Sequence, residues 1–294
     1  MILEIKDLCM TYPGGKKALD HLNLTLEPGI YGLLGENGAG KSTLMNILTC
    51  NLKQTGGTIC YEGKDIREHT QDYVKRIGYM PQQQGLYRSM TAVQFLTYMS
   101  NLKGIKKNKA KEQIPMLLEK VNLSSVYNKK LGSFSGGMKQ RILIAQAMLG
   151  NPQVLIFDEP TAGLDPKERI RVRNLISELS FEKIVIIATH VVTDVEFISR
   201  ELLILKQGHL IRQGSNEDLT AELEDLVYEI PISKEYYKKV EKELLVSSIR
   251  SDQDNVYLRV VGNPETIRKY VGMNNDMKKM RPELDDLYLY LFKE

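Results

Sequence analysis

A glycine-rich loop at residues 35–43, Gly-Glu-Asn-Gly-Ala-Gly-Lys-Ser-Thr, constrains the fold of this 294-residue chain more than any other segment. It follows a short apolar run at residues 30–34 and precedes an apolar helical pattern at residues 44–48. Glycines with this spacing let successive backbone N–H groups turn inward around a phosphate, and the following helix directs its positive end at the same anion. The sequence therefore predicts a strand, a phosphate-binding loop and a helix. A chance glycine-rich turn is the alternative.

Two side chains of this loop carry further chemistry. Lys41 supplies a mobile positive charge for the β- and γ-phosphates of a nucleotide. The hydroxyl of Ser42 is suited to Mg²⁺. The loop by itself does not distinguish a kinase from a GTPase or an ATPase, so a second acidic element is needed.

That acidic element follows the apolar run at residues 154–157, where Asp158 and Glu159 end a predicted buried strand. In an open α/β sheet, ligands bind at the carboxyl ends of the strands. We expect Asp158 to hold Mg²⁺ through water, and Glu159 to polarise an attacking water molecule. The alternative, an ordinary strand end with solvated acids, is weakened by the presence of the phosphate loop.

His190 directly follows another apolar strand pattern, at residues 184–189. It would share the carboxyl edge of the sheet with the two acids, so we expect it to contact the γ-phosphate. A surface or capping histidine is the alternative interpretation.

The segment Ser135-Gly-Gly-Met-Lys-Gln precedes an apolar helix at residues 142–149. A serine N-cap followed by two glycines exposes backbone donors at a helix start, which is a second potential anion site. If it cannot reach the phosphate loop of its own chain, it can serve the site of a partner molecule. A simple helix cap is the alternative.

Six motifs follow one another over residues 1 to about 215. They are the phosphate loop, Gln82, Ser135-Gly-Gly, Asp158-Glu159, Leu164-Asp165 and His190. This is the order found in ATP-binding subunits of ABC transporters, so the chain resembles that family. The resemblance implies ATP and Mg²⁺ as cofactors and a head-to-tail dimer, here a homodimer, that encloses two ATP molecules.

The resemblance also implies roles for individual residues. Glu159 would be the catalytic base, His190 the switch histidine, and Gln82 the residue that senses Mg²⁺ and water and touches the permease. Asp165 would belong to the D-loop, and Ser135, Gly136 and Gly137 would cap the partner's γ-phosphate. The implied Mg²⁺ ligands are Ser42, Gln82 and Asp158. Tyr12, alternatively a buried strand-edge tyrosine, would stack on adenine. The implied ATP-binding residues are Tyr12, Gly35, Asn37, Gly38, Ala39, Gly40, Lys41, Ser42 and Thr43.

The chain departs from the family's usual Leu-Ser-Gly-Gly-Gln signature, because Phe134 and Met138 flank Ser-Gly-Gly here. Met138 followed by Lys139 also occurs in the branch that drives exporters of drugs, bacteriocins or polysaccharides. The segment after about residue 220 resembles, more loosely, the accessory domain of that branch; a passive dimer brace is its alternative role. Since Glu159 and His190 are present, we expect both sites of the homodimer to hydrolyse ATP.

Strand and helix patterns alternate from residue 154 to residue 205, which predicts a parallel sheet covered by helices. The resemblance implies an α/β phosphate-loop NTPase core with a mixed sheet, an antiparallel β subdomain and an inserted helical subdomain at about residues 85–150. We place the ATPase domain at residues 1–220 and a small α+β extension at residues 221–294. Further expected elements are strands at 2–8, 22–26 and 201–205, a helix from Thr91 capped with Gln94, a helix that starts or kinks at Pro115, helices at 166–179 and 191–198, and, beyond residue 220, a strand at 227–232, a helix at 234–244, a hairpin at 246–261 and a helix at 263–270.

Composition excludes several classes of protein. Forty Lys and Arg against 37 Asp and Glu give a net charge of +3, which is too small to predict binding to nucleic acid or membranes. No apolar run approaches the roughly 18 residues of a membrane-spanning helix, and no signal peptide is recognisable. The three cysteines suit reduced thiols in the cytosol. We expect a cytoplasmic protein held at the inner face of the membrane by a permease.

The favoured function is an ATP-hydrolysing motor subunit of an exporter, with no nucleic acid partner and with separate transmembrane permease subunits. One alternative is a soluble ABC ATPase acting on DNA or ribosomes, which the lysine-rich run at residues 106–111 supports best. A charge run of this size is more often a solvated helix start, or faces anionic lipid. A regulatory module without turnover is a third reading, opposed by Glu159 and His190. The transported substrate is not predicted, because the membrane subunits select it.

Overall fold

The computed structural model describes residues 1–82, 85–233, 237–251, 256–270 and 277–293. The chain forms two compact units, Met1–Gln213 and Gly214–Glu294. The sequence predicts this boundary near residue 220, at the end of helix α7 (Asn216–Ala221). In the structure α7 contacts α10 (Leu284–Leu291) and belongs to the second unit.

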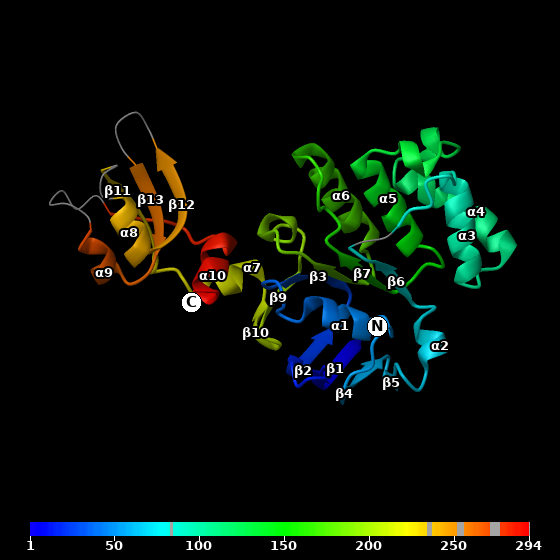
Figure 1. The fold of residues 1–294 in the computed structure, drawn as a ribbon, viewed down its shortest axis with the longest axis horizontal. Coiled ribbons are helices and arrows are strands. Elements are labelled where there is room, and N and C mark those ends of the chain that lie inside the picture. The colour runs from blue at the N-terminus through cyan, green and yellow to red at the C-terminus, as the bar shows by residue number, and fades with distance from the viewer. Residues whose placement is uncertain (83–84, 234–236, 252–255, 271–276, 294) are drawn as a thin grey trace. The chain divides into compact units, whose positions relative to one another are not determined.

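The main sheet of the first unit has six strands (Figure 1). Strands β3, β6, β7, β8 and β9 are short, apolar and mostly buried, whereas the edge strand β10 is largely polar and has no buried residue. From β9 to β6, every pair of neighbouring strands is parallel. Parallel pairing brings the carboxyl ends of these strands to one edge, where ligands bind in open α/β sheets. In spatial order the strands are β10 (His209–Gly214), β9 (Glu201–Lys206), β3 (Gly29–Leu34), β8 (Ile184–Ala188), β7 (Val154–Asp158) and β6 (Ile77–Met80).

A second, antiparallel sheet confirms the expected β subdomain. Helix α1 (Lys41–Leu48) shares one apolar core with both sheets, so the helix that follows the phosphate loop is fixed from two sides. The sequence patterns had predicted two of its strands, and the other two were missed. The strands are β2 (Lys17–Leu26), β1 (Leu3–Thr11), β4 (Gly56–Tyr61) and β5 (Lys64–Asp65).

A helical region occupies the middle of the first unit. The capping box predicted for α3 is confirmed, because the Thr91 side chain accepts from the Gln94 amide at 3.2 Å and the Gln94 side chain accepts from the Thr91 amide at 2.9 Å. No helix in the described part of the chain is long and apolar enough to span a membrane. The helical elements of the unit are α2 (Thr70–Tyr73), α3 (Ala92–Leu102), α4 (Lys107–Lys120), η1 (Ser124–Val126), η2 (Leu131–Ser133), α5 (Gly136–Ala147), α6 (Pro166–Leu179) and η3 (Val192–Asp194).

Two helix predictions need correction. Of the two outcomes predicted at Pro115, a helix start is wrong, because the proline lies inside α4, with the buried residues Ile114 and Leu117 on either side of it. That packing offsets the roughly 3 kcal/mol that an interior proline costs. A kink at Pro115 stays a prediction. The helix predicted at 191–198 is only the 3₁₀ turn η3, in which the buried Asp194 carboxylate turns inward to accept a hydrogen bond from Thr161.

The second unit contains an antiparallel sheet with its own apolar core. Its strand at residues 227–232 and its hairpin were predicted, and the helix expected at 234–244 begins at Tyr237 within the described residues. Arg259 and Asp286 form a buried ion pair, with Arg259 Nε donating to both carboxylate oxygens at 3.0 and 3.1 Å. The elements are β12 (Leu245–Ser251), β13 (Val256–Val261), β11 (Val227–Ile232), β14 (Lys278–Lys279), α8 (Tyr237–Glu243), α9 (Pro264–Arg268), α7 and α10.

Candidate nucleotide site

The phosphate loop lies between β3 and α1, as the sequence predicts. Gly40 has a φ of 111°, and a Cβ atom added there would lie 2.5 Å from the Ala18 carbonyl oxygen, so only glycine fits. Lys41 Nζ donates to the carbonyl oxygens of Gly35 and, at 3.0 Å, of Glu36. Burial lowers the pKa of Lys41, and the nearby Glu159 carboxylate opposes this effect. The lysine is thus held by neutral carbonyls at a place where phosphate oxygens would be stronger partners.

A cavity of about 340 Å³ opens beside this loop and brings most of the predicted residues together. Lys16, Ala18 and Glu36 also line the cavity and were not predicted as site residues. Ala18 lies in β2 and Lys16 directly precedes it. The sequence does not indicate that β2 packs against the phosphate loop, because this contact depends on the fold. Gly35 and Ala39 support the loop without lining the cavity. The lining residues are Tyr12, Lys16, Ala18, Glu36, Asn37, Gly38, Gly40, Lys41, Ser42, Thr43, Gln82, Asp158, Glu159 and His190.

Asp158 ends β7 at the floor of this cavity. Burial and the adjacent Glu159 carboxylate raise the pKa of Asp158 to about 6, although Lys41 acts in the opposite direction. A nearby cation stabilises the charged form of such a partly buried carboxylate. Asp158, Ser42 and Gln82 all offer oxygen ligands to the same cavity, and an oxygen donor set fits Mg²⁺.

Glu159 is held in one orientation by its neighbours. Its backbone is left-handed, with a φ of 51°, and its amide donates to the Ala188 carbonyl at 2.8 Å. Its buried carboxylate accepts from the His190 amide at 3.1 Å and from the Thr189 hydroxyl at 3.2 Å. His190 Nδ1 lies 2.7 Å from the same carboxylate. The strand ends of β7 and β8 thus bring an acid and an exposed imidazole into direct contact beside the phosphate loop.

A buried hydrogen bond that no sequence pattern indicates supports this edge of the sheet. The Thr161 hydroxyl donates to the Asp194 carboxylate, and both side chains are buried. The bond ties the loop after Glu159 to the turn after His190. No sequence pattern could have indicated it, because the two residues lie 33 positions apart and meet only through the pairing of β7 with β8.

Tyr12 lies at the cavity, where its hydroxyl is 3.2 Å from the Thr43 Oγ1 atom. It is partly buried and packs against the core of the first unit. One face of the site is therefore aromatic, while Lys16 adds an exposed positive charge.

The Ser135-Gly-Gly segment lies outside this cavity within the described chain. Ser135 is the exposed N-cap of α5, and its hydroxyl accepts from the Met138 amide at 3.3 Å. Gly136 lines a different cavity, to which Gln82 and Leu164 also contribute. Asp165 caps α6 by accepting from the Glu168 amide at 3.0 Å. As isolated elements, both segments are helix caps, and neither completes the nucleotide cavity of its own chain.

Comparisons with known proteins agree with this geometry. The family model described as ABC transporter matches residues 19–162. The chain is 36% identical to the uncharacterized ABC transporter ATP-binding protein YxlF of Bacillus subtilis, over 84% of this chain and 82% of that protein. It is 37% identical to the bacitracin transport ATP-binding protein BcrA of Bacillus licheniformis, over 72% of this chain and 69% of that protein.

A similar solved structure is the dimeric ATP-binding cassette MJ0796 in a post-hydrolysis state, bound to ADP and Pi. Its TM-score is 0.64 at 27% identity, and the match covers 72% of this chain and 98% of that chain. The shared part corresponds in extent to the first unit, which holds the nucleotide cavity.

Proposed function

Because this chain belongs to the ABC transporter family, as an ATP-binding and ATP-hydrolysing subunit, we propose that it dimerises head to tail and powers export through separate permease subunits. One observation carries the proposal. The nucleotide cavity combines the phosphate loop with the Glu159–His190 pair, yet Ser135-Gly-Gly, the second set of anion-binding donors, faces elsewhere. A second copy of the chain can supply its Ser135-Gly-Gly donors to each nucleotide cavity.

In this mechanism ATP first binds to one chain. Lys41 exchanges its carbonyl partners for the β- and γ-phosphates, while the loop amides and the start of α1 surround the same anion. Tyr12 offers its ring to the adenine. Ser42, Gln82 and Asp158 would hold Mg²⁺. Bound there, Mg²⁺ would neutralise charge that develops on the phosphates.

Hydrolysis then depends on Glu159. Its carboxylate, fixed by Thr189 and His190, orients a water molecule towards the γ-phosphate and accepts its proton. His190 is exposed on its other side and can donate to the γ-phosphate from there. Ser135, Gly136 and Gly137 of the partner close the site, with Asp165 at the same junction. Loss of the γ-phosphate removes the shared anion and reopens the dimer.

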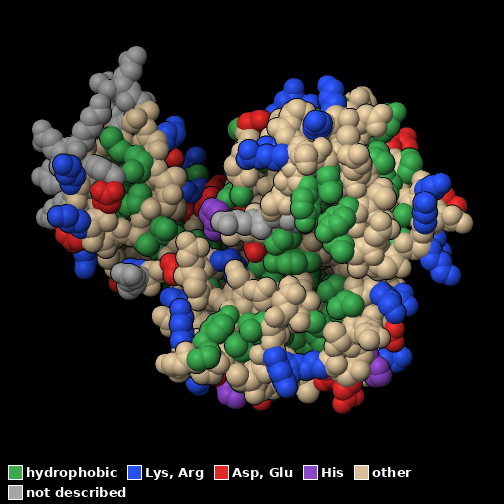
Figure 2. Space-filling model, turned by 45° about the vertical axis from the view of Figure 1, so that its right-hand side comes forward, with side chains coloured by type: hydrophobic (Ala, Val, Ile, Leu, Met, Phe, Trp, Pro, Cys, Tyr) green, Lys and Arg blue, Asp and Glu red, His purple; other side chains and the backbone are tan. Residues whose placement is uncertain are grey.

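Coupling to a permease would use the surface around Gln82. This residue lines both the nucleotide cavity and the neighbouring cavity that contains Gly136 and Leu86. Close to Gln82 in sequence, the exposed rings of Tyr87 and Tyr98 contact each other edge to face, with 5.4 Å between the ring centroids. Figure 2 shows hydrophobic side chains gathered on a face of the first unit, a feature typical of protein contact sites. The name of BcrA, a bacitracin transport ATP-binding protein, supports a role of this chain in transport.

Glu159→Gln is the decisive test of the dimer mechanism. The substitution is nearly isosteric, so ATP binding should survive, while loss of the base should slow hydrolysis by about 10²–10⁴-fold. ATP would then hold the dimer closed, because a ligand stabilises the state that it contacts most. Size-exclusion chromatography with ATP and Mg²⁺ should show a stable dimer of the variant and a mostly monomeric wild type.

Adding Ser135→Arg to Glu159→Gln should abolish that dimer, because bulk and charge would enter the partner's phosphate site. Ser125→Arg, at an exposed serine of η1, is the matched control and should leave the dimer intact. A Glu159→Gln variant that stays monomeric with ATP bound would contradict the composite site. Hydrolysis at the wild-type rate would exclude Glu159 as the base.

Association with a permease is tested by capture of any membrane protein that is encoded beside this chain. The chain should retain that protein in detergent, and membranes should retain the chain. Retention on nucleic acid or ribosomes instead would favour the soluble alternative, for which the exposed lysines at the start of α4 are the best candidate surface.

A further inference from the structure

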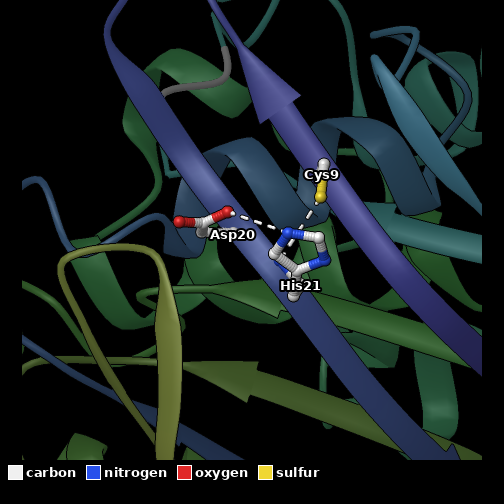
Figure 3. Close-up of side chains that lie close together, drawn as sticks. All are labelled: Cys9, Asp20 and His21. Atoms are coloured by element: carbon white, nitrogen blue, oxygen red, sulfur yellow. Dashed lines mark hydrogen bonds and ion pairs between the residues drawn. The ribbon is translucent and has the colours of Figure 1, made fainter.

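A cluster of metal-binding side chains lies on the antiparallel sheet, apart from the residues proposed to bind Mg²⁺. Cys9 comes from β1, and Asp20 and His21 come from β2 (Figure 3). One donor atom from each of the three side chains, a thiol sulfur, a carboxylate oxygen and an imidazole nitrogen, lies within 4.8 Å of the other two. Sulfur and nitrogen ligands are uncommon for Mg²⁺ and suit transition metals.

The register of the two strands explains why these side chains meet. Leu8 pairs with Leu22 and Met10 pairs with Leu19, so Cys9 alone faces two residues of the partner strand. This is a β-bulge, which redirects side chains locally. His21 adopts a left-handed φ of 51°, and its amide donates to Cys9 Sγ at 3.3 Å. A non-glycine residue in this region is strained, and such strain is concentrated at functional sites.

A second observation concerns the imidazole of His21. Its Nδ1 atom lies 2.5 Å from the Asp7 carboxylate, while its Nε2 atom lies 3.7 Å from Asp20 Oδ1. Asn23 adds a brace, because it accepts from the Asp7 amide and donates to the His21 carbonyl, both at 2.9 Å. Histidines that bind metals donate their other ring N–H to a carboxylate in this way, which fixes the tautomer and the ring orientation. Asp7 therefore leaves the Nε2 lone pair available on the side of Asp20.

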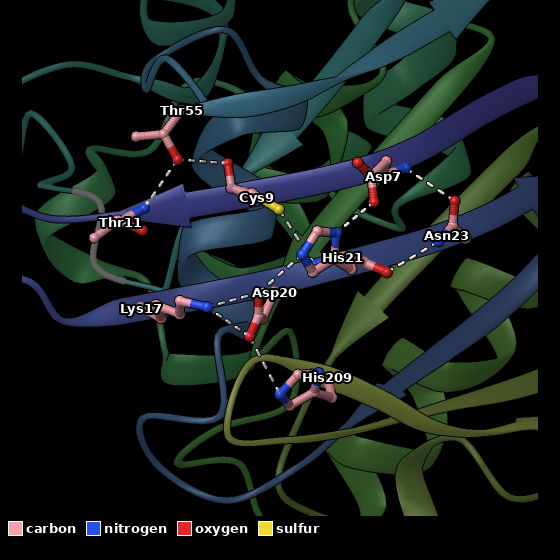
Figure 4. Close-up of polar contacts among 9 residues, drawn as sticks. All are labelled: Asp7, Cys9, Thr11, Lys17, Asp20, His21, Asn23, Thr55 and His209. Atoms are coloured by element: carbon pink, nitrogen blue, oxygen red, sulfur yellow. Dashed lines mark hydrogen bonds and ion pairs between the residues drawn. The ribbon is translucent and has the colours of Figure 1, made fainter.

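His209, the first residue of β10, places a further imidazole beside Asp20 (Figure 4). His209 Nε2 lies 3.7 Å from Asp20 Oδ2, and the Asp20 amide donates to the Gly208 carbonyl at 3.0 Å. Lys17 is the competing cation, with Nζ 3.2 Å from the same carboxylate. Its side chain is 61% exposed, so it can leave without being stranded in the interior.

We propose that Cys9, Asp20 and His21 bind one divalent transition-metal ion of the zinc class, and that His209 completes a four-ligand shell. Cysteine, histidine and aspartate are the usual ligands of tetrahedral Zn²⁺. The ion displaces Lys17 from Asp20 and the proton from the Cys9 thiol, and Asp7 orients His21. It would tie β1, β2 and the start of β10 together at one point.

Titration with Co²⁺ tests this site in the full-length, reduced protein without nucleotide. We expect one equivalent to bind with a thiolate-to-Co²⁺ charge-transfer band, and Zn²⁺ to displace it. Cys9→Ser should abolish the band. The triple variant Cys50→Ser, Cys60→Ser, His69→Ala removes the other cysteines and a histidine outside both sites, and should keep it. ATP binding and thermal unfolding confirm that each variant is folded.

Positioning by Asp7 has its own readout. Asp7→Asn should keep the band but weaken Co²⁺ binding by about 10–100-fold, as expected for a partner that orients a ligand. A wild type without the band, a band that persists in Cys9→Ser, or its loss in the triple control would overturn the site. Unchanged Co²⁺ affinity in His209→Ala would overturn the fourth ligand.

Discussion

At the scale of single residues, the adjacent carboxylates of Asp158 and Glu159 have a thermodynamic effect in the nucleotide-free protein. Burial and Glu159 raise the pKa of Asp158 from 3.8 to about 6, so the folded state binds this proton more tightly than the unfolded state. The free energy of unfolding therefore falls as the pH rises from about 4 to about 6. Above about pH 6, the ionised Asp158 lowers the free energy of unfolding by its full amount.

Asp158→Asn should accordingly stabilise the nucleotide-free first unit at neutral pH. We expect about 1 kcal/mol, less than the pKa shift alone implies because the carboxylate is partly exposed. The gain should disappear as the pH approaches about 4. Thermal unfolding in the presence of a chelator, measured across this pH range, checks the prediction. A gain that is the same at both ends of the range would mean that the carboxylate pair is not its cause.

Lys41→Ala should abolish tight ATP binding, because this half-buried ammonium is the positive charge of the loop and charge-assisted bonds to phosphate are strong. Nucleotide titration measures the affinity. Lys16→Ala is the matched control: this lysine also lines the cavity but is exposed, so a smaller loss is expected. Equal losses in the two variants would argue against the special role of Lys41.

At the scale of elements, the strand β6 is packed so tightly on α5 that one residue decides the contact. A Cβ atom added at Gly78 would lie 2.1 Å from the Ala147 carbonyl oxygen and 2.8 Å from a Leu155 methyl group. Gly78→Ala should therefore lower the free energy of unfolding by about 1–3 kcal/mol. Gly85→Ala, where no described atom lies within 4 Å, is the control. Denaturant unfolding compares the two variants, which should differ clearly in midpoint.

The elements also show how far sequence patterns reach. Strands β3, β7 and β8 were predictable because both of their faces are buried and their residues are almost all apolar. Strand β6 was missed because four residues that include a glycine carry no pattern, and its pairing with β7 makes it a strand. Glu159 and His190 were predictable as site residues because each directly follows an apolar strand pattern. Their supporting contacts through Thr161 and Asp194 were not, since these depend on tertiary structure.

At the scale of the whole molecule, the two units should unfold in separate transitions. In the second unit, Asp286 pairs with Arg259 and also accepts from Ser247 at 2.6 Å and from the Glu283 amide at 2.8 Å. Asp286→Ala removes the buried partner of Arg259 and leaves this guanidinium only the exposed Glu283 carboxylate, 3.5 Å away, and the Arg281 carbonyl. Breaking a buried ion pair typically costs about 3–5 kcal/mol. Calorimetry should show that this variant loses stability only in the second unit, and that ATP raises only the transition of the first.

The exposed neighbour Asp285 supplies the control, since Asp285→Ala should leave both transitions close to those of the wild type. A single transition that responds both to Asp286→Ala and to ATP would show that the two units unfold together.

The position of Ser135-Gly-Gly outside its own chain's cavity has a consequence for reaction order. If each site needs a second copy, turnover in dilute solution is second order in protein, and the rate per chain falls as the protein is diluted. A free subunit would then consume little cellular ATP. Two copies docked on one permease would instead meet at a high effective concentration that does not depend on how much protein the cell makes. Assembly on the permease would thus activate ATP hydrolysis, and only where a substrate can be transported.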